Sequence, residues 1–525
     1  MKPDLHLPSR NNIAAAWDSA LSQAAASFVA ELSTKQRHDL FEYYFAAYNY
    51  LSLLPRVARR AMQRKLLRSV SVFPTESRQR LVRSVSGAAL LLALSQSAQP
   101  AMIPVTTNIP ALNDGDNQCS LIEAIINSNS HAATHPDCVA GDGVDTVVLP
   151  TNTTITLSSI YADYQGDTAL PVITGNITIQ GNGTAIVRNK KKKTPGRLLA
   201  VSDTGSLRLE NVILSGGNQA QGGAIFNTGV LALVDSVISG NKATDGGGIY
   251  NAGGAILDVA NSLITRNSAA FYGAGVFNCG SFTIANSTIS ANTAGSLGGG
   301  FTHLQKRHSE YGSLFPRFPG CYASTGGTID KSTIYNNRAG AGGGVANLQG
   351  GIVVLNSTIS GNTAAGSGGG LLNSQYSGTR IENGTITGNI VNSKGSGQGG
   401  GIANGSFAQL DLKLSIISGN KATMGPEIKN SAVGTVHAES NIFGLNGNSG
   451  VYGFFPTPGV PAPGVKLKNI LSRLADNGGP TLTHALVPGS PAIDAAPVDA
   501  DCPATDQRGV TRPQGGGCDI GAFEQ

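Results

Sequence analysis

Apolar residues recur at regular spacing through the middle of the chain and form three columns when two short blocks are aligned. One block has the form N-S-T-I-S-G-N, and its closing asparagines, from Asn218 to Asn420, follow at intervals of 23, 26, 25, 45, 25, 27 and 31 residues. The second block has the form G-G-G-I-x-N. All 24 column positions are aliphatic or aromatic, which predicts that each repeat supplies short strands with one buried face. The columns are Leu209, Leu233, Val259, Ile284, Ile329, Val354, Ile381 and Leu412; Leu214, Ile238, Ile264, Ile289, Ile334, Ile359, Ile386 and Ile417; and Ile225, Ile249, Val276, Phe301, Val345, Leu371, Ile402 and Ile428.

Glycine decides which repeat architecture these strands build. Three successive glycines per unit would cost about 1 kcal/mol each in a helix, so helical solenoids and leucine-rich repeats are excluded. A coil of roughly 24 residues with three short strands is typical of an all-β solenoid, a right-handed parallel β-helix of about 10–12 coils. We expect the glycines to supply left-handed backbone at the corners and the asparagines to stack as hydrogen-bonded ladders between coils.

Glycine and charge both divide the chain near residue 100. Of 69 glycines only Gly87 lies before Ala101, and the first 101 residues hold 13 Lys and Arg against 6 Asp and Glu, a balance of +7. The rest of the chain holds 24 against 26, a balance of −2, so the formal charge of +5 belongs to the leader. The body therefore lacks the basic composition that nucleic acid binding requires, and no nucleic acid partner is expected.

Residues 78–101 have the order of a secretory signal peptide. Three arginines between residues 78 and 83 precede the apolar stretch Val85–Leu94, and small and polar residues follow. This stretch is too short to cross roughly 30 Å of hydrocarbon, so export is favoured and no transmembrane span is expected in the mature chain. Residues 1–77 are predicted as a helical N-terminal extension, which is open to three interpretations: an extended leader, an artefact of a start site before Met62, or a cytosolic helical module.

Six cysteines fit an exported protein but do not fix their own pairing, because six allow 15 pairings. None stands in a C-x-x-C pair, so neither a zinc site nor a redox site is expected. Local separation favours two short-range disulfides and leaves two cysteines for a third. The pairs are Cys119 with Cys138, Cys502 with Cys518, and Cys279 with Cys321.

Both ends of the stack need covering, because an open coil offers unpaired strand edges to other chains. We expect residues 102–150 to form an N-terminal cap, in which Ser120 and Glu123 form the capping box of a short helix. The β-helix is expected over residues 151–450. Residues 451–525 are expected to form a C-terminal cap with a disulfide-closed tail.

The sequences of these two ends resemble domains of exported bacterial proteins. CSLIEAI, from Cys119 to Ile125, is similar to the N-terminal CSLREA-type domain of bacterial surface proteins, with isoleucine in place of the usual arginine. DNGGPTLTHALVPGSPAID and DQRGVTRPQGGGCDIGAFE, within Asp476–Glu524, resemble a choice-of-anchor Q domain. GGAIFN, at Gly222–Asn227, is similar to the repeats of polymorphic outer-membrane proteins, which are adhesins. These resemblances imply an exported β-helix at the cell surface or outer membrane, with release or non-covalent retention expected because the match ends one residue before Gln525.

Catalysis is the main alternative to a binding role, because parallel β-helices commonly carry polysaccharide lyases and hydrolases. Hydrolases need converging carboxylates, and lyases need acidic residues that bind calcium together with a base. The carboxylates between Val201 and Asn430 fall into different columns of the repeat, and Asp245 is the only acid directly before a Gly-Gly block. We therefore assign no catalytic residue, no cofactor and no metal ligand.

One irregular coil holds the candidate binding residues. The 45-residue interval contains about 20 extra residues within Thr302–Ser324, where cations beside aromatics suit an acidic sugar or an anionic partner. A plain surface loop tied by Cys279 and Cys321 is the other interpretation. The candidate binding residues are His303, Lys306, Arg307, His308, Tyr311 and Arg317.

Taken with the resemblances, these patterns predict a secreted or cell-surface protein that is adhesin-like. Its partner is expected to be an extracellular polysaccharide or a molecule on a host or neighbouring surface. The alternative is a polysaccharide-degrading enzyme, a lyase or a glycoside hydrolase, on the pectate-lyase-like fold.

Overall fold

The structure is a computed structural model that describes most of the chain from residue 101 to residue 525. The expected helical extension and the signal segment up to residue 100 lie outside the described residues. Residues 100–525 form one compact unit. Within that unit, the residues left undescribed are 190, 192–195, 306–320, 322–325, 394, 445–449, 455–465 and 498–501.

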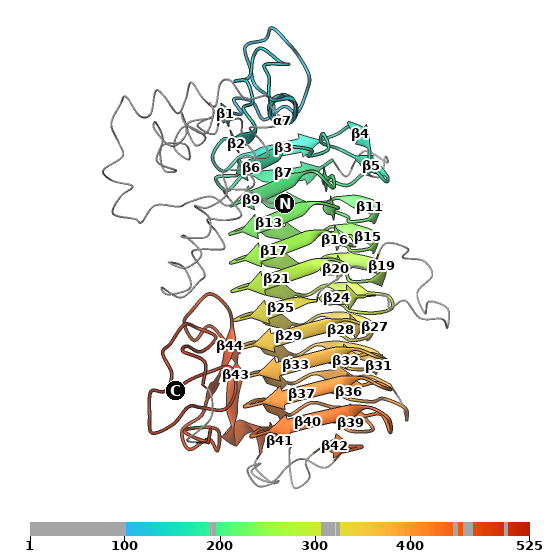
Figure 1. Cartoon of the computed structure of the whole chain (residues 1–525), viewed down its shortest axis with the longest axis vertical. Coiled ribbons are helices and arrows are strands. Elements are labelled where there is room, and N and C mark those ends of the chain that lie inside the picture. The colour runs from blue at the N-terminus through green and yellow to red at the C-terminus, as the bar shows by residue number, and fades with distance from the viewer. Residues whose placement is uncertain are drawn as a thin grey trace, which may run out of the picture. The chain divides into compact units, whose positions relative to one another are not determined.

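Four parallel sheets wind around a common interior and form a right-handed parallel β-helix (Figure 1). We number the sheets 1 to 4 in the order in which a coil passes through them. The sequence predicted three strands per coil, and this was wrong for most coils, which have four. Sheet 3 was missed because its inward position is usually alanine, as at Ala243, Ala269 and Ala339, and not a large aliphatic residue.

Each sheet takes one strand from each successive coil. Sheet 1 contains β1 (Met102–Pro104), β2 (Val144–Val148), β6 (Asn176–Gln180), β9 (Ser206–Glu210), β13 (Val230–Val234), β17 (Ile256–Ala260), β21 (Ser281–Ala285), β25 (Gly327–Asp330), β29 (Gly351–Leu355), β33 (Gly378–Glu382), β37 (Gln409–Lys413) and β40 (Thr435–Glu439). Sheet 2 contains β3 (Thr154–Leu157), β7 (Ala185–Arg188), β10 (Ile213–Ser215), β14 (Val237–Ser239), β18 (Leu263–Thr265), β22 (Thr288–Ser290), β26 (Thr333–Tyr335), β30 (Thr358–Ser360), β34 (Thr385–Thr387), β38 (Ile416–Ser418) and β41 (Ile442–Phe443).

The other two sheets complete the coils. Sheet 3 contains β11 (Asn218–Gln221), β15 (Lys242–Asp245), β19 (Ser268–Tyr272), β23 (Thr293–Ala294), β27 (Arg338–Ala341), β31 (Thr363–Ser367) and β35 (Ile390–Val391). Sheet 4 contains β8 (Leu199–Val201), β12 (Ile225–Asn227), β16 (Ile249–Asn251), β20 (Val276–Asn278), β24 (Phe301–Leu304), β28 (Val345–Leu348), β32 (Leu371–Asn373), β36 (Ile402–Asn404), β39 (Ile428–Asn430) and β42 (Val451–Tyr452).

The three predicted apolar columns are the inward positions of sheets 1, 2 and 4. In sheet 1, for example, Leu209 pairs with Leu233, and Leu233 pairs with Val259 on the next coil. None of the 24 side chains is more than 2% exposed. The stacking of like residues thus confirms the solenoid and its dry aliphatic interior, since burial of apolar surface is the main force that closes each coil on the next.

A ladder of buried asparagines joins the coils where sheet 2 ends. In each of six steps, Nδ2 of one asparagine donates to Oδ1 of the next at 2.9–3.1 Å. Glu427 ends the ladder, because its Oε2 accepts from Nδ2 of Asn420 at 2.5 Å. Asn218 was aligned with this column, but it lies one residue beyond the ladder position, which Gly217 occupies. The ladder residues are Asn241, Asn267, Asn292, Asn337, Asn362, Asn389 and Asn420.

A second ladder follows sheet 4 and corresponds to the asparagine of the G-G-G-I-x-N block. Its described steps between asparagine side chains have Nδ2 to Oδ1 distances of 2.6–3.2 Å. The ladder contains one histidine, His303, where the other coils have asparagine. Its members are Asn227, Asn251, Asn278, His303, Asn347, Asn373, Asn404 and Asn430.

The glycine blocks stand where coils approach most closely. Gly342 has a φ of +60°, a left-handed conformation that favours glycine. A Cβ atom on Gly343 would lie 2.4 Å from the carbonyl oxygen of Gly369 on the next coil. The block therefore requires glycine for two different reasons, backbone conformation at its first position and close backbone contact at its second.

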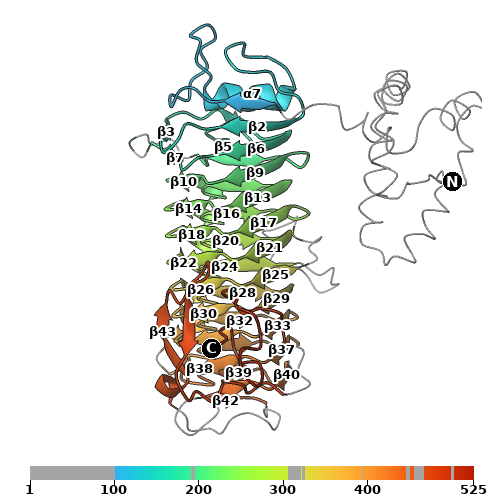
Figure 2. The same ribbon diagram turned by 90° about the vertical axis from the view of Figure 1, so that its left-hand side faces the viewer.

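Helix α7 (Leu121–Ser130) lies across the first coils, as Figure 2 shows. The predicted capping box is present, since Ser120 Oγ accepts from the N–H of Glu123 and the Glu123 carboxylate accepts from the N–H of Ser120. The Cys119–Cys138 disulfide closes this segment. The first two strands of sheet 1, β1 and β2, lie within residues 102–150, so the β-helix begins earlier than the expected boundary at residue 151.

The C-terminal segment packs against the side of the solenoid, although a cap over its end was expected. It contains the hairpin of β43 (Leu471–Ala475) and β44 (Thr483–Leu486), preceded by a 3-10 helix (Leu467–Asn469). Its described contacts include the outer face of sheet 2, where Thr333 Oγ1 donates to Leu482 O and Thr358 Oγ1 donates to Gln507 Oε1. Figures 1 and 2 show this segment beside the lower coils. The other two expected disulfides are also present, Cys502–Cys518 in this segment and Cys279–Cys321 in the irregular coil.

Candidate functional site

A groove runs along the outer face of sheet 1. It consists of two adjoining hollows of about 660 and 610 Å³, which are continuous because Arg380 and Asp411 line both. We call it the sheet 1 groove. Its acidic and basic lining residues are Asp258, Arg380, Glu382, Asp411, Lys413, His437 and Glu439.

The floor of the groove follows from the two-residue period of the strands. In the strands that form this floor the second and fourth residues face inward, so the first, third and fifth residues face outward. Register then places Arg380 beside Asp411 and Asp411 beside His437 on successive coils. The neighbouring outward column consists of Glu382, Lys413 and Glu439.

Contacts within each strand hold some of these polar groups in place. Nε of Arg380 donates to Oε1 of Glu382 at 2.8 Å, and Nε2 of Gln409 donates to Oδ2 of Asp411 at 2.8 Å. The Arg380 side chain remains 58% exposed. Such exposed pairs add little stability, at most about 1 kcal/mol, so these charges are free to exchange partners with a ligand.

The distribution of charge along the groove is uneven. On the coils of β21, β25 and β29 the central outward residues are Thr283, Thr328 and Val353, which are neutral. The charges are concentrated on β33, β37 and β40, the last three strands of sheet 1. Because positive and negative side chains alternate there, the described part of sheet 1 has no continuous column of carboxylates, as the sequence indicated.

The candidate binding residues of the irregular coil are placed only in part. His303 is on β24, fully buried, and its Nδ1 lies 2.9 Å from Nδ2 of Asn278, so it belongs to the second ladder. Burial lowers the pKa of His303 to about 4, which keeps the ring neutral and lets Nδ1 accept this hydrogen bond. The other five candidates, Lys306, Arg307, His308, Tyr311 and Arg317, lie outside the described residues.

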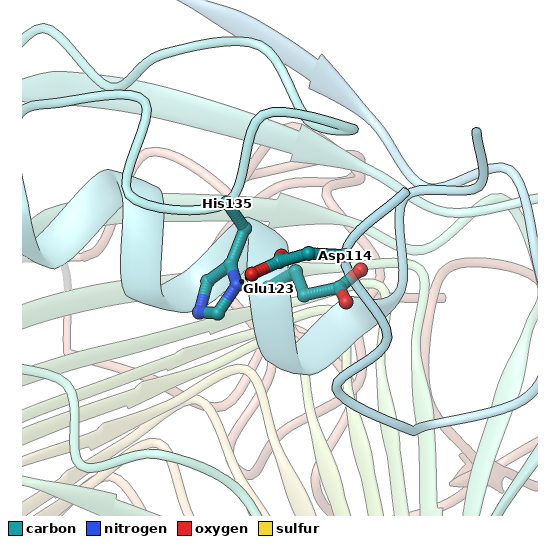
Figure 3. A group of neighbouring side chains, drawn as sticks. All are labelled: Asp114, Glu123 and His135. Carbon is teal, nitrogen blue, oxygen red and sulfur yellow. Dashed lines mark hydrogen bonds and ion pairs between the residues drawn. The ribbon is translucent and has the colours of Figure 1, made fainter. Parts of the chain in front are cut away.

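One group of side chains in the N-terminal segment offers possible metal ligands. Ligand atoms of Asp114, Glu123 and His135 lie within 4.8 Å of one another (Figure 3). Each already has a structural partner: Asp114 Oδ1 lies 2.7 Å from His135 Nδ1, and the Glu123 carboxylate accepts from the N–H groups of Asn113 and Ser120. These contacts fix the loop before helix α7, and we assign the group a structural role.

Among the described residues, the most deeply buried ion pair lies in the C-terminal segment. Nη1 of Arg512 donates to Oε2 of Glu524 at 2.9 Å and to the carbonyl oxygen of Asp519 at 2.7 Å. Burial raises the pKa of both Asp519 and Glu524. These residues lie within the stretch from residue 476 to residue 524 that the sequence analysis singled out. Since neither side chain of the Arg512–Glu524 pair is more than 1% exposed, the network holds the tail together and offers no accessible site.

The fold therefore defines a parallel β-helix protein with a polar groove on one sheet. No family model matches the chain, and no curated protein matches it. Among solved structures, the crystal structure of pectate lyase Pel9A matches with 14% identity and a TM-score of 0.37. That match covers 82% of this chain and 98% of the lyase. No helix in the described part of the chain is both long and apolar enough to cross a membrane.

Proposed function

We propose that this protein is exported and binds an extracellular polysaccharide in the sheet 1 groove, without cleaving it. The observation that carries the proposal is the floor of the groove, where charged and amide side chains on three successive coils face outward together. Sugar hydroxyl groups both donate and accept hydrogen bonds, and the alternation of carboxylate, amide and guanidinium groups supplies partners for both.

The repeat spacing supports a chain-like ligand. Neighbouring strands of a sheet lie about 4.8 Å apart, so a polymer that follows the groove meets a new set of outward side chains on each coil. A rigid solenoid also needs no rearrangement to present these side chains, which reduces the entropy lost on binding.

Export is supported by two features. The segment 78–101 has the order of a signal peptide, and all three disulfides are of the kind that persist in oxidising compartments. We extend the proposal to location at the bacterial cell surface, in an adhesin-like role, on the resemblance of Cys119–Ile125 and Asp476–Glu524 to CSLREA-type and choice-of-anchor Q domains.

The test is binding of the purified chain to a panel of soluble polysaccharides, measured by retardation in affinity gels, with reducing ends and unsaturated products assayed in parallel. Arg380→Ala is expected to weaken binding at least fivefold. Arg208→Ala is the matched control, because Arg208 also pairs with a glutamate two residues on, Glu210, in the same sheet but outside the groove lining. An equal loss of affinity in both variants would contradict the groove as the binding site. If the wild type forms products and Asp411→Asn does not, the protein is an enzyme and the binding proposal is wrong.

A further inference from the structure

Two exposed aromatic side chains stack on each other where sheet 4 turns into sheet 1. Tyr376 and Phe407 stand on successive coils, with ring centroids 5.2 Å apart and ring planes inclined by 6°. Tyr376 is 37% exposed and Phe407 is 57% exposed. Large aromatic surface of this kind is usually buried, and an exposed pair is a feature of binding surfaces.

The backbone at both residues is in a conformation that bulky side chains rarely adopt. φ is +61° at Tyr376 and +55° at Phe407. The equivalent positions two residues before β17 and β29 are Gly254 and Gln349, with φ values of +83° and +65°, so the turn itself requires a positive φ. Because neither ring is buried in the core, packing does not explain why these two coils carry aromatic residues at this position. Strained residues of this kind are concentrated at functional sites.

The pair lies beside the charged part of the sheet 1 groove. Tyr376 and Phe407 precede the groove-lining residues Gly378 and Gln409 by two positions each. The same two coils carry Arg380 and Asp411 on the groove floor. An apolar aromatic edge thus meets a polar floor, the combination that a sugar ring requires, since its C–H faces are apolar and its hydroxyl groups are polar.

The charge of the groove indicates the class of glycan. Its lining carries four carboxylates against the two cations Arg380 and Lys413, so these six side chains carry a net charge of −2. A polyanion such as polygalacturonate would be repelled by this potential, whereas an uncharged chain would not. The carboxylates are Asp258, Glu382, Asp411 and Glu439.

We propose that Tyr376 and Phe407, together with Gln409 and Asp411, form a sugar-binding subsite of the sheet 1 groove and that its ligand is a neutral glycan. This inference rests on the proposed polysaccharide binding and specifies its ligand class and its central residues.

The experiment measures affinity of the full chain for neutral chains (xyloglucan, glucomannan, mixed-linkage β-glucan) and for anionic chains (polygalacturonate, alginate). Glycine is the substitution of choice, because it fits a positive φ and leaves the turn unstrained. The double variant Tyr376→Gly with Phe407→Gly is expected to bind the neutral chains at least tenfold more weakly. Phe271→Ala is the control, since Phe271 is a similarly exposed aromatic residue on sheet 3. If the glycine variant unfolds at a lower temperature than the wild type, Phe407→Leu, which keeps apolar bulk without a ring, replaces it.

The outcomes separate the two proposals. Binding to no polysaccharide would overturn the proposed function itself. Binding to anionic chains in preference to neutral ones would overturn the ligand class and leave the groove as the site. The subsite would be overturned if the aromatic variants bind neutral chains as tightly as the wild type does. It would also be overturned if Phe271→Ala weakens this binding equally.

Discussion

The His303→Asn variant is expected to lose less stability in mild acid than the wild type does. His303 occupies an asparagine position of the second ladder, where its Nδ1 accepts from Nδ2 of Asn278. Burial lowers the pKa of His303 from 6.5 to about 4. The folded protein therefore keeps this ring neutral down to about pH 4, whereas the unfolded chain takes up a proton near pH 6.5.

The sign and the size follow from proton linkage. A lowered pKa in the folded state stabilises the protein above pH 6.5, and this contribution is lost as the pH falls towards 4. The interval between the two pKa values corresponds to about 3 kcal/mol of unfolding free energy. His303→Asn removes the titrating group, so its unfolding free energy should fall by about 3 kcal/mol less than that of the wild type over this range.

A second effect of the substitution is visible at neutral pH. Oδ1 of Asn347, on the coil after His303, is buried without a hydrogen-bond partner in the described structure. Asparagine at position 303 would direct its Nδ2 to this oxygen, as Asn373 and Asn404 do within the same ladder. Satisfying a buried acceptor stabilises by about 1–3 kcal/mol, offset in part by the cavity that the smaller side chain leaves.

The assay is equilibrium unfolding in urea, followed by circular dichroism at pH 7.5, 6.5, 5.5 and 4.5. His437→Asn is the control, because His437 is exposed on the groove and its loss leaves the ladder intact. Burial also lowers the pKa of His484, so part of the acid loss should persist in His303→Asn. Parallel pH dependence of the wild type and His303→Asn would refute the reasoning.

Two further substitutions test the ladder end and the glycine blocks. Burial raises the pKa of Glu427 to about 7, so the unfolding free energy of the wild type should fall by about 3 kcal/mol as the pH rises from 4.5 to 7. Glu427→Gln keeps an acceptor for Asn420 but does not titrate, so its unfolding free energy should depend less on pH. A profile unchanged by the substitution would count against this assignment. Gly343→Ala should lower the unfolding free energy by about 2–4 kcal/mol, because the new Cβ would lie 2.4 Å from the carbonyl oxygen of Gly369. Gly351→Ala should change the unfolding free energy by less than about 0.5 kcal/mol, because a Cβ at Gly351 meets open space. Equal effects of the two alanines on the urea midpoint would contradict the close-contact explanation.

The coils could be predicted from the sequence because their period is local and their inward residues are large and aliphatic. The same reasoning missed sheet 3, where the inward residues are mostly alanines that polar segments also contain. The C-terminal segment shows the limit of local information more directly. β22 and β30 have the identical sequence T-I-S, yet Thr288 is half-buried whereas Thr358 is fully buried beneath Gln507. The docking site of that segment depends on contacts distant in the sequence, which a repeat pattern does not contain.

The groove was missed for a different reason, since its signal was present in the aligned repeats. The residue before each first-column position faces outward, and on the last two aligned coils it is Arg380 and Asp411. His437 pairs with Asp411 on the coil that follows. A search for columns of carboxylates alone does not detect such a group, because the charges alternate in sign. The cations and aromatic residues of the irregular coil predicted a binding site there instead. Of those candidates the structure describes His303, which is an internal ladder residue.

A regular solenoid presents nearly the same surface on every coil, so the coils that depart from the repeat indicate where function is located. Departures inside the stack, such as His303 and Glu427, change hydrogen bonding between coils and hence stability. Departures outside the stack that strain the backbone, such as Tyr376 and Phe407, gain nothing from core packing. These two residues stand on the coils where the groove becomes charged. A single ligand that contacts the aromatic pair and the charged groove floor would explain both departures from the repeat, neither of which the fold itself requires.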